Sequence, residues 1–252
     1  MIKAIKFIKK QRTLSTIFRY NPPMIIYGKQ IVLYVLEKHP HLIEEVFLSK
    51  EIDKKLFTRF AKLDKKIHKV DNQKAQALAK GGNHQGLILK LIHPEYTDIK
   101  EFKKMNFILV LDGVTDVGNI GAIARTAYSM GIEGLIVSNI KTVNNSGVIR
   151  TSSGALLDLP FLVHPRSADL ASELIDAGFA LIGATTDGID LKKYGKIEKS
   201  DKVALFLGSE GEGISPKVTK KLDLKVSIAM EHEFDSLNVS VAAGILIYNL
   251  KR

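Results

Sequence analysis

The sequence predicts an α/β protein with two domains, the larger of which contains a mostly parallel sheet. Three observations support this fold class: a length of 252 residues, short apolar runs that alternate with helical periodicity beyond residue 106, and positive charge confined to the first part of the chain. The composition is 45% apolar and 25% charged, with a mean hydropathy of +0.04, which is typical of globular proteins. No apolar run reaches the roughly 18 residues that a membrane span needs, so we expect no membrane association.

Charge divides the chain into two unlike parts. Residues 1–106 carry 22 Lys and Arg against 10 Asp and Glu, whereas residues 107–252 carry 15 against 17. This asymmetry predicts a first part that faces a polyanion, with nucleic acid as the favoured candidate, and a nearly neutral second part with another task. The alternative is a solvated basic face without a partner.

Residues 1–22 form a basic N-terminal extension that has six Lys and Arg and no acidic residue. Three interpretations remain open: an arm that contacts RNA, an amphipathic organelle presequence, and an extension without a function. We favour the RNA arm.

Residues 23–95 are expected to form a compact α/β domain, and residues 96–105 a linker. The predicted elements are a helix over 31–38, a strand over 45–49, a helix over 54–63 and a strand over 86–91. Together with the excess of positive charge, this organisation predicts a compact domain that faces the polyanion.

Residues 106–252 are expected to form the second domain. Strands are predicted over 107–111, 134–137, 159–163, 180–183, 203–208 and 225–228, and helices over 120–130, 168–177 and 237–250. Strands that alternate with helices predict a parallel sheet, because parallel neighbours need crossover connections. Ligands then bind at the carboxyl ends of the strands.

The first loop of interest follows the strand predicted over 107–111. Asn119 and Gly121 precede a helix, where Asn119 would cap free N–H groups and the helix dipole would favour an anion; a well-capped helix alone is the simpler alternative. Arg125 interrupts a series of small and apolar residues, so its guanidinium needs an acidic or phosphate partner.

Two further loops follow later strands. Residues 207–216 contain Gly208, Glu210 and two more glycines, which allow close approach to a ligand or simply form a flexible turn. Before the last helix, Ser236 is expected to be the N-cap, and Asn238, one turn in, must find polar partners. This helix is apolar on nearly every side, which predicts that it is buried.

Several chemistries are disfavoured by what the sequence lacks. The chain has no cysteine, its seven histidines are scattered, and it has no Gly-x-Ser-x-Gly elbow, Walker A loop or dinucleotide fingerprint. We therefore expect no metal site and no acyl transfer, and we favour a cytoplasmic location.

Taken together, three motifs resemble the SpoU/TrmH family of RNA ribose methyltransferases, which belongs to the SPOUT superfamily. They are Asn119-x-Gly121-x-x-x-Arg125, the stretch 207–215, and Ile228-Ala-Met230 followed by residues 236–240. The resemblance is nearest to the bacterial enzymes that methylate guanosine 2′-hydroxyls in 23S ribosomal RNA. It implies a SPOUT domain with a deep trefoil knot, a ribosomal-protein-like substrate-binding domain before it, and a homodimer.

The resemblance also implies roles for ten residues. The residues implied to bind the cofactor S-adenosylmethionine are Thr185, Gly208, Ile228, Met230 and Leu237. The residues implied to surround the reacting ribose are Asn119, Arg125, Glu210, Ser236 and Asn238. One departure is Ala229, where the family usually has proline, and the loss of that ring makes the turn less rigid.

The predicted function is therefore methyl transfer from S-adenosylmethionine to a ribose 2′-hydroxyl, with a guanosine of large-subunit ribosomal RNA as the favoured target. The alternatives are a transfer RNA methyltransferase and a catalytically idle RNA-binding or ribosome-assembly factor of the same fold. A nicotinamide-dependent enzyme is disfavoured, because the dinucleotide fingerprint is missing.

Overall fold

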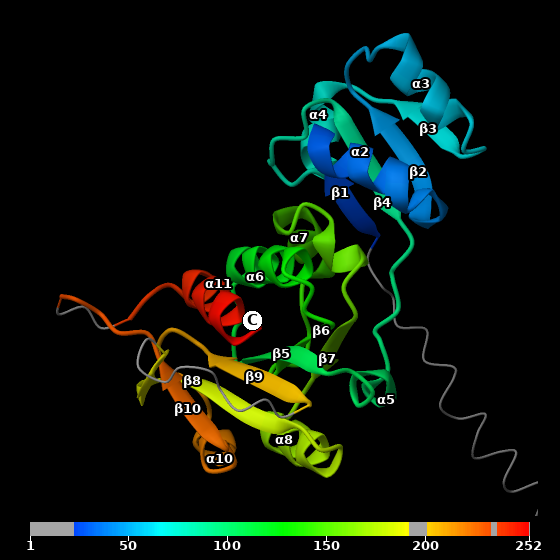
Figure 1. Ribbon diagram of the computed structural model, residues 1–252. Helices are drawn as coiled ribbons and strands as arrows, with labels where there is room; N and C mark the ends of the chain where they lie inside the picture. Colours follow the sequence, from blue (N-terminus) through cyan, green and yellow to red (C-terminus); the bar gives the residue numbers. More distant parts are fainter. Residues whose placement is uncertain (1–22, 192–200, 233–235, 252) are drawn as a thin grey trace, which may run out of the picture.

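The computed structural model describes residues 23–191, 201–232 and 236–251, which fold around two β-sheets (Figure 1). The predicted basic arm, residues 1–22, lies outside the described residues. No helix in the described part of the chain combines the length and apolar composition that crossing a bilayer requires.

The first sheet has four strands in the order β1-β4-β2-β3. Its strands are β1 (Met24–Tyr27), β2 (Ile43–Leu48), β3 (Lys66–Lys69) and β4 (Leu87–Leu91). Strand β4 pairs antiparallel with β1 and β2, whereas β3 runs parallel to β2 along one edge. Three helices and one 3-10 turn connect the strands: α2 (Lys29–Lys38), η1 (Pro40–Leu42), α3 (Lys54–Ala61) and α4 (Asn72–Leu78).

Successive residues of these strands face opposite sides of the sheet. Val46 and Leu89 are fully buried in a large cluster with residues of α2 and α3. Phe47 and Ile88 instead join Ala75 of α4 in a small cluster on the other face. One face of this sheet is therefore well covered and the other only in part.

The second sheet has six parallel strands in the order β10-β8-β9-β5-β6-β7. They are β5 (Phe107–Asp112), β6 (Gly134–Ser138), β7 (Phe161–His164), β8 (Ala180–Asp190), β9 (Val203–Gly208) and β10 (Leu224–Ser227). Every pairing in it is parallel, which confirms the predicted α/β class. The predicted knot is not tested by these pairings and stays a prediction.

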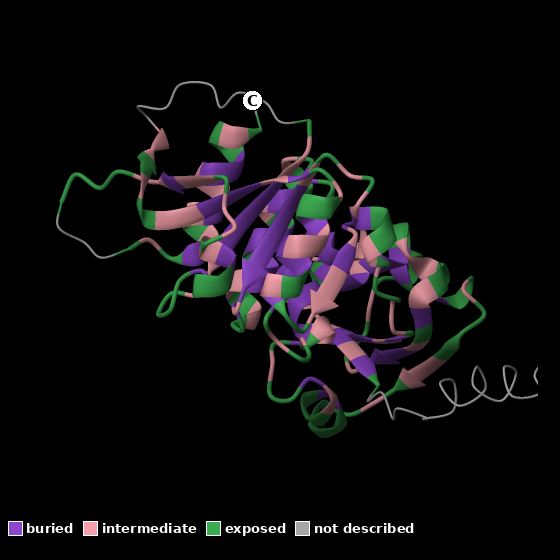
Figure 2. Cartoon of the chain, turned by 90° about the horizontal axis from the view of Figure 1, so that it is seen from below, coloured by how far each residue is buried: buried purple, intermediate pink, exposed green. Residues whose placement is uncertain are grey.

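Helices cover both faces of the parallel sheet, and its central strands are buried (Figure 2). The elements are α5 (Ile99–Phe102), α6 (Val117–Ser129), α7 (Asn145–Thr151), η2 (Ala155–Leu157), α8 (Ser167–Asp176), α10 (Pro216–Thr219) and α11 (Val239–Leu250). Helices α6 and α11 share one hydrophobic cluster with the sheet, and α8 and α10 share the other. This two-sided burial explains why the strands consist of nearly continuous apolar runs.

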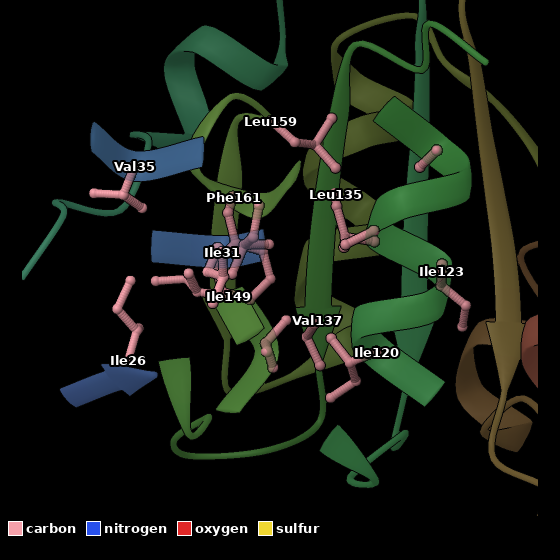
Figure 3. Packing of buried hydrophobic residues seen from close by; sticks show 14 of the residues in the cluster. Ile26, Ile31, Val35, Ile120, Ile123, Leu135, Val137, Ile149, Leu159 and Phe161 are labelled. Carbon is pink, nitrogen blue, oxygen red and sulfur yellow. The ribbon is translucent and has the colours of Figure 1, made fainter. Parts of the chain in front are cut away.

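The two sheets are joined by packed side chains and not only by the chain between them. Figure 3 shows Ile31 and Val35 of α2 beside Ile149 and Phe161 of the second half, all within one cluster. The segment 96–105, expected to be a linker, contains α5, whose Phe102 is fully buried.

Polar contacts reinforce this junction. The Arg150 guanidinium of α7 lies 4.5 Å from the centroid of the Tyr27 ring and donates a hydrogen bond to its hydroxyl. The Tyr34 hydroxyl of α2 donates to the Asp158 carboxylate, and burial first, then Asp158, raises the pKa of Tyr34. His39 Nε2 lies 3.1 Å from the other oxygen of Asp158.

All thirteen elements predicted from periodicity are confirmed, with boundaries that differ by a few residues. The elements that were not predicted, such as β1, β3 and α7, have seven residues or fewer and show little periodicity. The prediction that the last helix is buried on all sides was wrong for the single chain. Val241 and Tyr248 of α11 are 51% and 55% exposed, because only one face of the helix packs on the sheet and on α6.

Candidate active site

A cavity of about 690 Å³ opens at the carboxyl ends of β8, β9 and β10, where a parallel sheet usually binds its ligand. Its walls come from the ends of these strands, from the loop after β9, and from the segment that enters α11. All five residues implied to bind the cofactor line it: Thr185, Gly208, Ile228, Met230 and Leu237. Ala229, at the position where the family usually has proline, lines it as well.

The loop after β9 folds tightly back on its own strand. Gly213 N donates to Ser209 O at 2.9 Å, and a Cβ atom on Gly208 would overlap the backbone of Gly213 and Ile214. Only glycine therefore fits at position 208. By contrast, a Cβ on Gly211 would meet no atom within 4 Å.

Asp112, at the end of β5, holds this loop from behind. Its side chain is buried, and Oδ2 accepts a hydrogen bond from Ser215 N at 2.8 Å. Asp112 lies opposite Gly208 in the β5–β9 register. Sequence reasoning missed this residue, although an acidic residue at the end of an apolar run was a visible signal.

Three polar side chains from distant parts of the chain meet beside the cavity. Asn238 Nδ2 donates to Glu210 Oε1 at 2.8 Å and to Asn119 Oδ1 at 3.0 Å. Asn119 Nδ2 donates to the same Glu210 oxygen at 3.3 Å. We call Asn119, Glu210 and Asn238 the polar triad. All three were predicted site residues, and the fold brings them together.

The two other residues predicted to surround the ribose lie outside this triad. Ser236 is exposed and lines the cavity, next to Leu237. Arg125 is exposed on α6, and its guanidinium forms no hydrogen bond or ion pair with any described residue. The partner that we expected for Arg125 is therefore not supplied by the described part of this chain.

Both predicted N-caps were wrong. Asn238, and not Ser236, caps α11, with its Oδ1 accepting from Ser240 N at 3.0 Å, because the helix begins at Val239. Similarly, α6 begins at Val117, so its cap is Asp116, which accepts from Asn119 N. Because Asp116 takes this role, the Asn119 amide is free to point toward Glu210.

The Thr185 hydroxyl is the most enclosed polar group in the wall of the cavity. Its Oγ1 is buried and makes no hydrogen bond of normal geometry within the described chain. The pKa of the nearby Asp187 carboxyl is lowered mainly by Lys225 and to a smaller extent by the Thr185 hydroxyl. Across residues 23–191, 201–232 and 236–251, no three acidic or histidine side chains are grouped as a metal site requires.

Comparison with known proteins gives consistent matches for both halves. Residues 106–248 match the model of the SpoU rRNA Methylase family, and residues 25–97 match the model described as RNA 2'-O ribose methyltransferase substrate binding. A putative TrmH family tRNA/rRNA methyltransferase of Staphylococcus aureus is 31% identical over 241 residues, which cover 90% of this chain and 95% of that protein.

Solved structures share the fold over nearly the whole chain. The AdoMet-bound rRNA methyltransferase of Sinorhizobium meliloti has a TM-score of 0.74 at 20% identity and covers 96% of this chain and 89% of its own. The SpoU methyltransferase AviRb of Streptomyces viridochromogenes, in complex with AdoMet, also has a TM-score of 0.74, at 21% identity, with 97% and 96% covered. At these identities the likeness establishes the fold.

Proposed function

Because this chain belongs to the SpoU rRNA methylase family, we propose that it transfers a methyl group from S-adenosylmethionine to a ribose 2′-hydroxyl, with a guanosine of large-subunit ribosomal RNA as the target. The observation that carries this proposal is that the polar triad lies directly beside the cavity, because Glu210 belongs both to the triad and to the cavity wall. The two features provide a place for a methyl donor and polar groups beside it.

The cavity suits the proposed cofactor. Its volume of about 690 Å³ lies within the range of small-molecule sites, and its wall combines apolar residues with hydroxyl and carboxylate side chains. The backbone of Gly208, Ile228 and Leu237 would hold the cofactor, and the buried Thr185 hydroxyl would offer it a hydrogen bond. When bound, S-adenosylmethionine supplies a methyl group that its sulfonium has already activated.

The protein's own task is then alignment of the ribose. Glu210 Oε1 accepts from both Asn119 and Asn238, which fixes the two amides relative to each other. Orienting a hydroxyl in this way converts a bimolecular encounter into a positioned reaction. A guanidinium is a cation that suits phosphate recognition, so we assign Arg125 the task of holding an RNA phosphate and thereby positioning the 2′-hydroxyl.

Ribosomal RNA is favoured over transfer RNA by the domain that precedes the catalytic one. We propose that residues 23–95 form the domain that binds the RNA substrate and that residues 106–252 form the methyltransferase domain. Residues 96–105 link the two domains, and residues 1–22 form a basic extension. The excess of positive charge before residue 107 supports RNA binding there. An idle factor is disfavoured, because all five polar residues of the family's site are retained.

We also propose a homodimer in which a second copy covers the exposed side of α11. Val241 is 51% exposed, and Tyr128 on the neighbouring α6 is 44% exposed, so the pair of helices presents an apolar surface. The site lies at the start of α11, and the partner subunit would therefore lie close to it. We place the protein in the cytoplasm, with its RNA.

The decisive experiment is ribose methylation mapping of ribosomal and transfer RNA from a deletion strain and its parent. We expect one ribosomal site to lose its methyl group, and purified protein with labelled S-adenosylmethionine to restore it on RNA from the deletion strain. If a transfer RNA site disappeared instead, the substrate would be wrong. If no site changed and no label were transferred, the enzymatic function would be wrong.

A further inference from the structure

Helix α3 presents a basic outer surface to solvent. Leu56 and Phe60 anchor the helix in the core, whereas Lys54, Lys55, Phe57, Arg59 and Lys62 are all exposed. We call these five residues the outer α3 face. In Figure 1, α3 lies at the opposite end of the molecule from β10, where the cavity opens. The surface is therefore separate from the active site.

The four cations of this face have no partners within the described part of the chain. None of their side chains forms an ion pair or hydrogen bond there, although nine other cation–carboxylate contacts occur elsewhere in it. The one carboxylate at the start of the helix, Asp53, is engaged with the backbone, since Oδ1 accepts from Leu56 N at 2.8 Å. The positive charge of the face is thus not neutralised locally.

Helix stability does not explain these residues. Lys54 and Lys55 occupy the first turn, where the helix dipole disfavours cations, and that turn has no acidic residue. Lys55 and Arg59 are four residues apart, a spacing at which like charges repel. Lysines on the neighbouring edge strand β3 have another explanation, because edge charges prevent strand pairing. The α3 cations have no such structural role.

Phe57 adds an aromatic ring to this charged surface. Its side chain is 41% exposed, and it lies among lysines instead of in an apolar patch. An exposed ring between cations is the combination that single-stranded nucleic acids favour, because bases stack on the ring while cations contact phosphates. The ring together with the cations therefore favours a nucleic acid over a partner that supplies negative charge alone.

We propose that the outer α3 face is a second RNA-binding site, which contacts phosphates and one unpaired base of the substrate at a point remote from the methylated ribose. The inference rests on the proposed function, and it narrows the substrate to an RNA large enough to reach both ends of the molecule.

The junction between the sheets gives this second site a fixed distance from the first. Arg150 stacks on Tyr27, Tyr34 bonds to Asp158, and the hydrophobic cluster is continuous across the boundary. A face that is rigidly attached to the catalytic half selects RNAs whose loop and target lie at the matching separation. The surface therefore contributes specificity as well as affinity.

The test compares a triple variant, Lys55→Gln, Arg59→Gln and Lys62→Gln, with a matched control, Lys100→Gln, Lys217→Gln and Lys220→Gln. The control lysines are also exposed, lie on or next to α5 and α10 outside the first sheet, and have no side-chain partner among the described residues. The probe is in-vitro-transcribed large-subunit ribosomal RNA, and its binding is measured between 50 and 200 mM salt, a range over which phosphate contacts change affinity steeply (roughly 10³-fold or more).

We expect the triple variant to bind at least about tenfold more weakly and to reduce the slope of log K against log salt by about two to three, whereas the control keeps both values. For methyl transfer, the variant should raise KM for the RNA and leave kcat at saturating RNA unaltered. Equal cofactor affinity and melting temperature would show that both variants are folded.

Phe57 is tested separately, with Phe57→Ala against Phe57→Tyr. Loss of stacking predicts about fivefold or greater weakening for alanine, and near wild-type binding for tyrosine, which keeps the ring. Equal weakening by both would remove the stacking part of the proposal.

Two outcomes would overturn the assignment to RNA. One is unchanged RNA affinity and salt slope in the triple variant. The other is full affinity for the naked RNA with weaker binding to the assembled large ribosomal particle, which would assign the face to a protein contact. If the protein transferred no methyl group but the triple variant still lost RNA binding, the proposed methyltransferase function would be wrong. The assignment of the outer α3 face to RNA binding would still be supported.

Discussion

The two sheets of this protein place their polar groups differently. In the parallel sheet, helices cover both faces, the central strands β5, β6 and β9 are apolar along nearly their whole length, and polar groups gather at one end of the sheet. In the four-stranded sheet one face is only partly covered, and polar side chains such as Glu45 and Lys90 lie on the strands themselves. The difference follows from how many faces each sheet must bury.

This contrast suits the proposed division of tasks between RNA binding and catalysis. A fully buried sheet is a rigid support, and it positions a few polar groups precisely because its own residues do not change partners. A sheet with one covered face has a larger exposed surface for its size and is suited to broad contact with a charged polymer. We therefore expect changes in the parallel half to affect catalysis steeply and changes in the first half to act gradually.

The largest effect is expected from Gly208→Ala, which tests whether the backbone at the end of β9 tolerates any side chain. The new Cβ would overlap the Gly213 and Ile214 backbone, so we expect the free energy of unfolding to fall by about 3 kcal/mol and the affinity for S-adenosylmethionine by more than about 100-fold. Thermal unfolding and isothermal titration measure the two.

The matched control is Gly211→Ala, in the same loop, where a Cβ meets nothing within 4 Å. Its melting temperature should stay within about 2 °C of the wild type. Equal damage by both substitutions would mean that the loop is sensitive in general and that the close approach at Gly208 has no special role.

Arg125→Ala is expected to reduce kcat by about 100-fold, because a misplaced hydroxyl reacts slowly, without altering the melting temperature or cofactor affinity. The side chain is exposed and has no partner among the described residues, so its removal costs no native contact. Arg166→Ala, another exposed arginine of the same half, should retain wild-type turnover. Wild-type turnover in Arg125→Ala would disprove the positioning role.

Tyr34→Phe tests whether the two regions unfold together. Removing the hydroxyl deprives Asp158 of one of its two partners in the junction and leaves only His39, so we expect a loss of about 1–2 kcal/mol and a melting temperature lower by about 2–6 °C, still in one transition. Tyr96→Phe, whose hydroxyl donates a longer 3.3 Å bond to Asn145, should have a smaller effect. Two separate transitions would show that the halves are not one cooperative unit.

Sequence reasoning succeeded where one residue type determines local structure. The strands of the parallel half were predictable, because burial on both faces leaves continuous apolar runs such as 107–111. The motifs also pointed to Gly208, which the structure places in the wall of the cavity, and to Asn238, which it places in the polar triad. The short edge strand β3, with the sequence Lys-Ile-His-Lys, has no comparable signal.

The sequence did not allow specific contacts between residues to be predicted correctly. The caps of α6 and α11 were assigned three and two residues away from their true positions, because several polar residues near each helix start can serve equally well. Asp112 was missed, since its role depends on Ser215, which is 103 residues away in the sequence. The exposed side of α11 was mistaken for core, because composition alone does not show which face has a neighbour in the same chain.

The smallest effect is expected from Glu45→Gln, on the partly covered face of the first sheet. Glu45 Oε1 accepts from Lys90 Nζ at 2.8 Å, and this lysine first, then His68, lowers the pKa of the Glu45 carboxyl. A lowered pKa in the folded state means that the stabilisation is present above the ordinary glutamate value near 4.3 and is lost as pH falls through the lowered one.

At pH 7 the variant should therefore melt about 1–3 °C below the wild type, and at pH 3 the difference should shrink toward zero. Glu44→Gln is the matched control, because Glu44 is more exposed and lies 3.4 Å from the same lysine, so its effect should be smaller at either pH. A difference that grew on acidification would have the wrong sign for this ion pair. A pH-independent difference would instead assign the role of Glu45 to packing on the sheet, and the exposed charges of the first half would then contribute to binding without stabilising the fold.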